Sequence, residues 1–193
     1  AQNEVSYDKF HTNKDRVYEL WNRGIWSDKL QCWNTTPRIA AKYLKEDIAE
    51  IEKVARVNWP TTTLFAYGDK QLNAVGNAVD PEFLDIFSFP MINGNSKTVL
   101  SDPKSIVITE KLAKKIFGNE DPVNQVLRAN DIMELKVTGV YKDFPYNSHF
   151  HPDFLASFAT MRDTNVYGQQ QLETNWGNNA FSTYLLLPED YDA

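Results

Sequence analysis

The spacing of apolar side chains changes between Ser105 and Phe117, and the change predicts two successive elements. Residues Ser105–Ile108 form a short β-branched run, which is typical of a buried strand. Thr109 stands at the N-cap position of a helix, and Gly118 follows the last turn of that helix. The apolar residues between them share one helix face: Leu112, Ala113, Ile116 and Phe117. The pattern predicts a strand that runs directly into a helix with a buried face.

Alternation of apolar and polar residues, which is the period of a strand, recurs in other parts of the chain. Gly68-Asp69 separates two such segments, Thr61–Tyr67 and Gln71–Val79, and predicts that they pair as a hairpin. The same period is kept by Leu135, Val137 and Tyr141. Further strands are expected at Asp15–Trp21, Val54–Trp59, Phe150–Phe158 and Phe181–Leu187.

Two more helices are expected before residue 90. Thr36-Pro37 predicts the start of one, because threonine is a good N-cap and proline suits the first helical position. The apolar face of this helix would comprise Ile39, Tyr43, Leu44, Ile48, Ile51 and Val54. A short helix is expected over Pro81–Phe87, with Asp80 as its cap. Asn22–Thr36 and Pro90–Gly94 follow no clear period and are expected to be irregular.

The order of these elements favours an α+β fold. The expected order is β-α-β-β before residue 80 and β-α-β after residue 150. Short connections bring such elements into one sheet with helices on one face. We therefore expect a split β-α-β sheet subdomain made of residues 1–80 and 150–193. Residues 81–149 are expected to form a smaller inserted α/β subdomain.

Composition narrows the functional classes. A chain of 193 residues with 42% apolar and 13% aromatic residues can bury a sizeable core. Its net charge of −6 disfavours nucleic acid and anionic lipid headgroups as main partners. No apolar run approaches the roughly 18 residues that a membrane helix needs, and the polar first residues do not resemble a signal peptide. A soluble domain is therefore expected.

No motif in the sequence predicts catalysis. The phosphate-binding pattern GxxxxGK[ST], the GxGxxG fingerprint and the GxSxG elbow do not occur, so neither ATP hydrolysis, a catalytic residue nor a cofactor is predicted. Cys32 is the single cysteine, which argues against a disulfide framework. His149, His151 and Asp153 would share one face of a strand and are chemically suitable zinc ligands. A polar strand edge is the favoured interpretation, so no metal site is predicted.

Five tryptophans are many for this length. The favoured interpretation places most of them in the core, and the alternative is an aromatic surface that binds a peptide or a sugar. Trp26 and Trp33 lie in an otherwise polar segment, so these two are the candidates for an exposed contact surface.

Four segments together resemble one family. SIVITEKLAKKIFGNEDP at 105–122, followed by VTGVYKDFPYNSHF at 137–150, resembles the MacB-like periplasmic core domain. SYDKFHTNKDRVYELW at 6–21 and VDPEFLDIFSFPMINGN at 79–95 resemble the versions of this domain found in Bacteroidetes-type bacteria. The family usually has a glycine and a basic residue where Asn124 and Gln125 stand, so these two residues do not predict its usual turn.

The resemblance implies an extracytoplasmic domain of an FtsX-like ABC transporter permease, at the periplasmic face of the bacterial inner membrane. It implies a porter-like split subdomain, no catalysis and no cofactor. The implied partners are the membrane helices of a dimeric permease, a separate ATPase subunit or domain, and a periplasmic adaptor or lipoprotein. The domain would transmit ATP-driven movement to a periplasmic substrate or partner, in efflux or in lipoprotein or peptide export. The alternative is a free-standing periplasmic module that binds a peptide, lipid or glycan.

A loop between two membrane helices must begin and end on the same side. We therefore expect the strand near Arg16–Trp21 and the strand Phe181–Leu187 to belong to one sheet, in the lobe nearer the membrane. The segment Ser105–Phe144 should lie away from that point or to one side.

Overall fold

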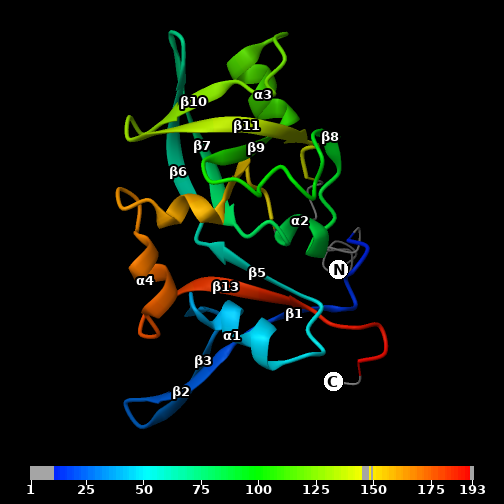
Figure 1. Ribbon diagram of the computed structural model, residues 1–193, viewed down its shortest axis with the longest axis vertical. Helices are drawn as coiled ribbons and strands as arrows, with labels where there is room; N and C mark the ends of the chain where they lie inside the picture. Colours follow the sequence, from blue (N-terminus) through cyan, green and yellow to red (C-terminus); the bar gives the residue numbers. More distant parts are fainter. Residues whose placement is uncertain (1–10, 145–147, 149, 192–193) are drawn as a thin grey trace.

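The computed structural model describes residues 11–144, 148 and 150–191. It shows an elongated α+β domain, as predicted, with helix α3 (Glu110–Phe117) at one end and a projecting β-hairpin at the other (Figure 1). An eleven-stranded sheet runs between them. The other helices are α1 (Ala40–Asp47), α2 (Phe83–Ile86), α4 (Gln169–Thr174) and a 3-10 helix (Phe158–Arg162).

Two groups of strands form the sheet. Those nearer the hairpin are β1 (Val17–Glu19), β4 (Thr36–Pro37), β5 (Lys53–Asn58) and β13 (Asn179–Leu186). Those nearer α3 are β6 (Thr61–Tyr67), β7 (Lys70–Val79), β8 (Met91–Asn93), β9 (Ser105–Thr109), β10 (Val126–Ala129), β11 (Met133–Tyr141) and β12 (Phe154–Ser157). The paired order is β1-β13-β5-β7-β12-β9-β11-β10-β6.

The strands nearer α3 close into a ring. β6 ends this order but also pairs with β7 along Thr61–Tyr67, so β7, β12, β9, β11, β10 and β6 form a small barrel. Side chains from these strands fill its interior, and Phe65, Leu127 and Leu135 are all buried there. Helix α3 packs its apolar face into the same cluster. The hydrophobic core of this half is therefore the barrel interior.

In the half of the domain nearer the projecting β-hairpin, hydrophobic clusters pack on both faces of strand β5. Ala55 and Val57 face the cluster that contains α2, whereas Val54 faces the cluster that contains α1. Successive side chains of a strand point to opposite faces, so α1 and α2 cover opposite faces of β5. Helix α2 lies outside residues 1–80 and 150–193, for which helices on one face are expected, so that expectation stays a prediction.

The strand–helix unit at β9 and α3 is confirmed. All of Ser105–Thr109 is buried, and the Thr109 hydroxyl accepts a hydrogen bond from the Leu112 amide at 3.1 Å. Asn124 has φ +70°, a left-handed conformation that asparagine tolerates better than most residues. Asn124 therefore adopts a backbone conformation that glycine would also suit.

The second predicted helix starts later than expected. Thr36 and Pro37 form strand β4, where the Thr36 hydroxyl bonds to the Thr183 hydroxyl at 2.7 Å and to the Phe181 carbonyl at 3.2 Å. Because the Thr36 hydroxyl is bonded to β13, it does not cap the helix. Helix α1 begins at Ala40 without a side-chain cap and ends at Asp47. The chain then becomes extended, and Val54 lies in β5.

Three other local expectations are also wrong. The Asp80 carboxylate binds Arg56, and α2 has Glu82 at its N-cap without a side-chain hydrogen bond. Met91–Asn93 within the expected loop pairs with β11 as strand β8. Asn22–Thr36 is not irregular, because it contains the hairpin of β2 (Asn22–Trp26) and β3 (Lys29–Trp33).

The division of the chain into residues 1–80 plus 150–193 and an insertion at 81–149 stays a prediction. Strand pairing crosses this division twice within the sheet. β6 pairs with β10, and β12 pairs with β9.

Candidate functional site

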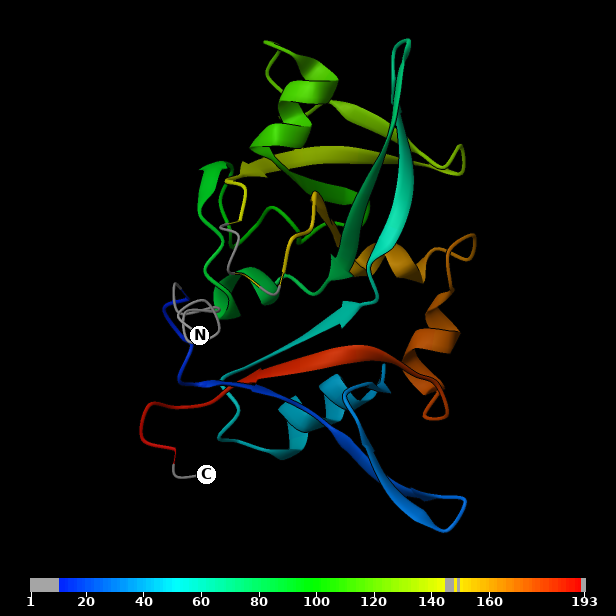
Figure 2. The same cartoon turned by 180° about the vertical axis from the view of Figure 1, so that it is seen from behind.

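The beginning and the end of the described chain lie side by side. β1 pairs antiparallel with β13, with Val17 opposite Leu186. Just beyond this pair, the Leu187 amide donates to the Arg16 carbonyl at 3.1 Å, and Arg16 Nε donates to the Leu187 carbonyl at 2.8 Å. The predicted pairing of the first and last strands in one sheet is therefore confirmed, and the barrel with α3 lies to one side of it (Figures 1 and 2).

Side chains reinforce this paired start and end. The Arg16 guanidinium forms an ion pair with Glu52 at 2.5 Å. The Tyr18 and Tyr191 rings meet edge to face, with centroids 6.3 Å apart. The first and last described segments are thus held together at one edge of the sheet.

The β2–β3 hairpin carries the two most exposed large apolar side chains of the described residues. Ile25, Trp26 and Leu30 are 77%, 70% and 57% exposed. The turn residues Ser27 and Asp28 both have positive φ, as a tight two-residue hairpin turn requires. The hairpin lies at the end of the molecule opposite α3 in both views (Figures 1 and 2). Its exposed apolar residues make it the candidate contact surface.

The two tryptophans proposed from the sequence share one face of this hairpin. The register pairs Trp26 with Lys29 and Asn22 with Trp33, so both indoles lie on the face that also carries Gly24. The Trp33 ring covers Gly24, where an added Cβ would lie 3.0 Å from it. Trp26 is therefore exposed, whereas Trp33 is half-buried.

Sequence reasoning missed the other face of the hairpin. Ile25 and Leu30 are directly opposite one another and form a cross-strand apolar pair there. The sequence contained little signal for this pair, because Ile25 and Trp26 are adjacent and break the alternation before the turn. The expectation that most tryptophans lie in the core is wrong, because Trp21, Trp59 and Trp176 are also more than half exposed.

The base of the hairpin is attached to the paired strands. Asn22 Nδ2 donates to the Thr35 carbonyl at 2.5 Å and to Asn179 Oδ1 on β13 at 3.1 Å. Asn34 Nδ2 donates to Glu19 on β1 at 3.1 Å. The hairpin therefore extends from the two strands that hold the start and end of the domain.

Two arginines hold the region where the barrel meets the other strands. Arg56 binds Asp80 through Nε at 2.8 Å and through Nη2 at 2.9 Å, and its guanidinium lies 4.0 Å above the Phe158 ring. Arg56 Nη1 also donates to the Arg38 carbonyl at 2.9 Å. Arg38 is fully buried with its guanidinium 3.3 Å from the centre of the Tyr167 ring, and this burial lowers its pKa.

The histidine and carboxylate set considered as a zinc site is only partly within the described chain. His149 lies outside the described residues, and His151 is exposed. The Asp153 carboxylate accepts a hydrogen bond from the Val75 amide at 3.0 Å, so this side chain is bound to the backbone of β7. Among the described residues, no group of three or more histidine, cysteine, aspartate or glutamate side chains is arranged to hold a metal ion.

The fold places the described chain among α+β domains whose first and last strands pair in one sheet. No helix in the described part of the chain has both the length and the apolar character needed to cross a membrane. Residues 1–192 match the model of the MacB-like periplasmic core domain, and the chain therefore belongs to this family. It is the periplasmic domain of a MacB- or FtsX-like permease, and such permeases belong to ABC transporters, which have ATPase partners.

Solved structures share this fold. A domain described as part of a permease protein from Porphyromonas gingivalis is 23% identical, with a TM-score of 0.79 over 95% of this chain and 78% of that chain. The periplasmic region of MacB from Actinobacillus actinomycetemcomitans is 16% identical, with a TM-score of 0.64 over 92% and 77%. The extracellular domain of the noncanonic ABC-type transporter YknZ from Gram-positive bacteria is 14% identical, with a TM-score of 0.63 over 90% and 84%. No curated protein sequence matches the chain.

Proposed function

We propose that this domain transmits ATP-driven movement of the permease membrane helices to a periplasmic substrate or partner, without catalysis of its own. The observation that supports this proposal is the pairing of its two ends. β1 and β13 are hydrogen-bonded neighbours, so helices attached to them act on one sheet. A displacement of these strands is carried through β5 into β7 and the barrel by continuous strand pairing.

We assign the contact with the partner to the β2–β3 hairpin. One face of the hairpin would contribute Trp26 and the half-buried Trp33, and the other face would contribute Ile25 and Leu30. Exposed apolar side chains that are flanked by charges are typical of protein interaction sites, and Arg23, Asp28 and Lys29 are all exposed here. The base of the hairpin is hydrogen-bonded to β1 and β13, so the hairpin moves with the strands that receive the displacement. The partner is a periplasmic adaptor or lipoprotein, and the parent permease is a dimer.

The test uses the complete permease with its ATPase. The double variant Ile25→Ser, Trp26→Ser removes two exposed side chains of the contact surface. The matched control, Val126→Ser, Trp176→Ser, removes one branched aliphatic residue and one tryptophan that are exposed elsewhere, at 45% and 53%. We expect transport to be lost only in the first variant, with ATP hydrolysis retained in both. Full transport by the hairpin variant would remove the hairpin from the mechanism.

The family match makes this chain part of a permease, so the alternative of a free-standing binding module is not retained. Binding by the same domain is the second candidate function. A surface hollow of about 360 Å³ favours it, because Trp59, Tyr184 and His151 line the hollow and could stack on a peptide or a sugar. Trp59→Ala in the complete permease tests this function, since transport that is unchanged by it would rule out the hollow as a binding site.

A further inference from the structure

The barrel has an apolar hollow at the end away from α3. Helix α3 contacts the barrel where the β6–β7 hairpin turns, and the Phe117 and Tyr67 rings lie 4.6 Å apart there. At the opposite end of β6, around Thr61–Thr63, the hollow has a volume of about 410 Å³. Its size falls within the range of about 300–1,000 Å³ that is usual for small-molecule sites, and barrel mouths often hold such sites.

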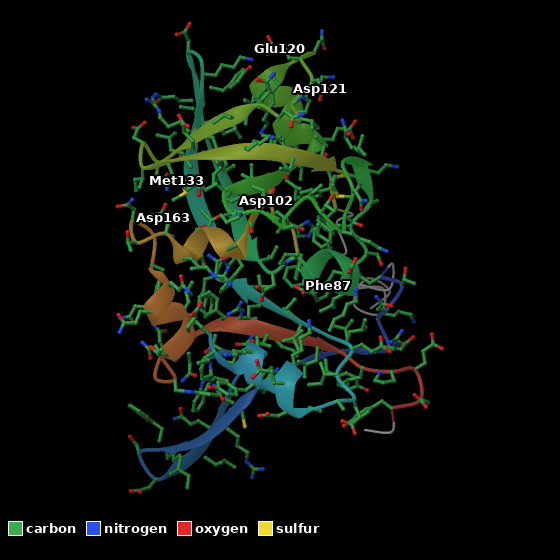
Figure 3. All side chains as sticks on the ribbon, in the orientation of Figure 1. Phe87, Asp102, Glu120, Asp121, Met133 and Asp163 are labelled. Atoms are coloured by element: carbon green, nitrogen blue, oxygen red, sulfur yellow. The ribbon has the colours of Figure 1, made fainter. Side chains whose placement is uncertain are left out.

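Apolar side chains form both the floor and the rim of this hollow. Leu135 and Phe154 are buried at the floor, where they belong to the barrel core. At the rim, Ile132 is 61% exposed and Val166 is 38% exposed. Figure 3 shows Met133, another lining residue, on the same side of the molecule as Asp163. An exposed apolar rim around an apolar floor offers a ligand more buried area than the floor alone.

The lining carries no charge. Its polar members are threonine, serine and asparagine, such as Thr61, Asn130 and Thr160. Two ion pairs beside these residues are internal to the domain, since Lys104 pairs with Asp163 at 3.3 Å and Arg128 pairs with Asp131 at 2.9 Å. A ligand with a charged group in the hollow would find no counter-ion in the lining, so a neutral apolar group is favoured.

Strand pairing around the barrel disfavours a peptide as the occupant. The six strands pair in a closed ring, and peptides that bind to sheets usually add a strand to a free edge. A peptide in the hollow would therefore leave much of its backbone without hydrogen-bond partners. An alkyl chain has no such groups and needs only apolar contact.

We propose that this hollow binds one alkyl chain of a neutral amphiphile, with the polar end at the threonine and asparagine side chains of the rim. The turn that bears Val166 forms one wall of the site. Asp163 holds this turn, because its carboxylate accepts from the Asn165 amide at 3.0 Å and its carbonyl accepts from the Val166 amide at 2.9 Å. This site is separate from the β2–β3 hairpin and does not depend on the role of that hairpin.

The test measures binding of the neutral fluorescent probe N-phenyl-1-naphthylamine to the domain, and its displacement by 1-dodecanol or by a blocked apolar tripeptide. The double variant Ile132→Ser, Val166→Ser removes the apolar rim. The matched control, Ile92→Ser, Val126→Ser, makes the same chemical change at two exposed residues that line neither the hollow nor the hairpin contact surface. Ala156→Phe fills the hollow from β12, and circular dichroism checks that each variant is folded.

We expect dodecanol to displace the probe from the natural sequence and from the control. Loss of two rim side chains should weaken probe binding by about fivefold or more, since each contributes part of the apolar area buried by the ligand. Folded Ala156→Phe should also bind weakly. Absence of probe binding, unchanged binding in both pocket variants, or displacement by the tripeptide but not by dodecanol would each overturn the proposal. Loss of binding in the control alone would place the probe elsewhere and would also overturn it.

Discussion

Asp80→Ala should destabilise the domain strongly, because it leaves Arg56 without its carboxylate at the point where β5 and β7 meet. The two charged side chains are 18% and 14% exposed and share two hydrogen bonds of 2.8 and 2.9 Å. Asp80 also accepts from the Arg56 amide at 2.8 Å. Breaking a buried ion pair by removing one partner typically costs about 3–5 kcal/mol. Partial exposure reduces this cost, so we expect about 2–4 kcal/mol for Asp80→Ala.

Urea unfolding followed by circular dichroism measures this loss, and a thermal scan gives a second reading. For a domain of this size, each kcal/mol lowers the melting temperature by about 2–4 °C. The double variant Arg56→Met, Asp80→Ala should be more stable than the sum of the single losses predicts, with a coupling energy of about 1–3 kcal/mol. Asp80→Asn, which keeps the shape and one acceptor oxygen, should cost less than Asp80→Ala. A loss below about 1 kcal/mol for Asp80→Ala, or additive single losses, would refute the reasoning.

Two further predictions concern the core and acid stability. Leu112→Ala and Phe117→Ala should each lower the free energy of unfolding in urea by about 2–5 kcal/mol, because both side chains are buried in the barrel cluster. Losses below about 1 kcal/mol for both variants would contradict that placement. Hydrogen bonds from the Asn165 amide and from Lys104 lower the pKa of Asp163, so its contribution to stability is present at neutral pH and is lost as the pH falls through its folded-state pKa. Asp163→Asn should therefore lose less stability than the natural sequence between neutral and acidic pH, and parallel stability profiles would contradict this.

Local patterns predicted an element well where the local signal and the tertiary contacts agree. Thr109 caps α3, and the apolar stripe of that helix is buried, because both signals lie within a few residues of each other. Thr36 failed as a cap because its hydroxyl binds Thr183, which is 147 residues away in the chain. Asp80 failed for the same reason, since its partner Arg56 lies on another strand.

The candidate contact surface was only half predictable. The polar surroundings of Trp26 correctly indicated exposure. Its arrangement with Ile25 and Leu30 depends on a turn with two positive φ angles at Ser27 and Asp28, for which the sequence lacks the usual glycine. Closure of the barrel depends on pairing between β6 and β10, which are far apart in the chain, so local patterns contained no signal for the hollow at its mouth.

Strand β7 has a consequence for how the domain unfolds. One edge of β7 pairs first with β6 along Lys70–Gly76 and then with β5 at Val79, while its Gly76–Val79 part pairs with β12. At Gly76 the Phe154 ring and carbonyl leave no room for a Cβ, so the strands are in direct backbone contact. Neither half can open fully without removing a strand from the other. We therefore expect the domain to unfold as one cooperative unit, although its outline suggests two parts.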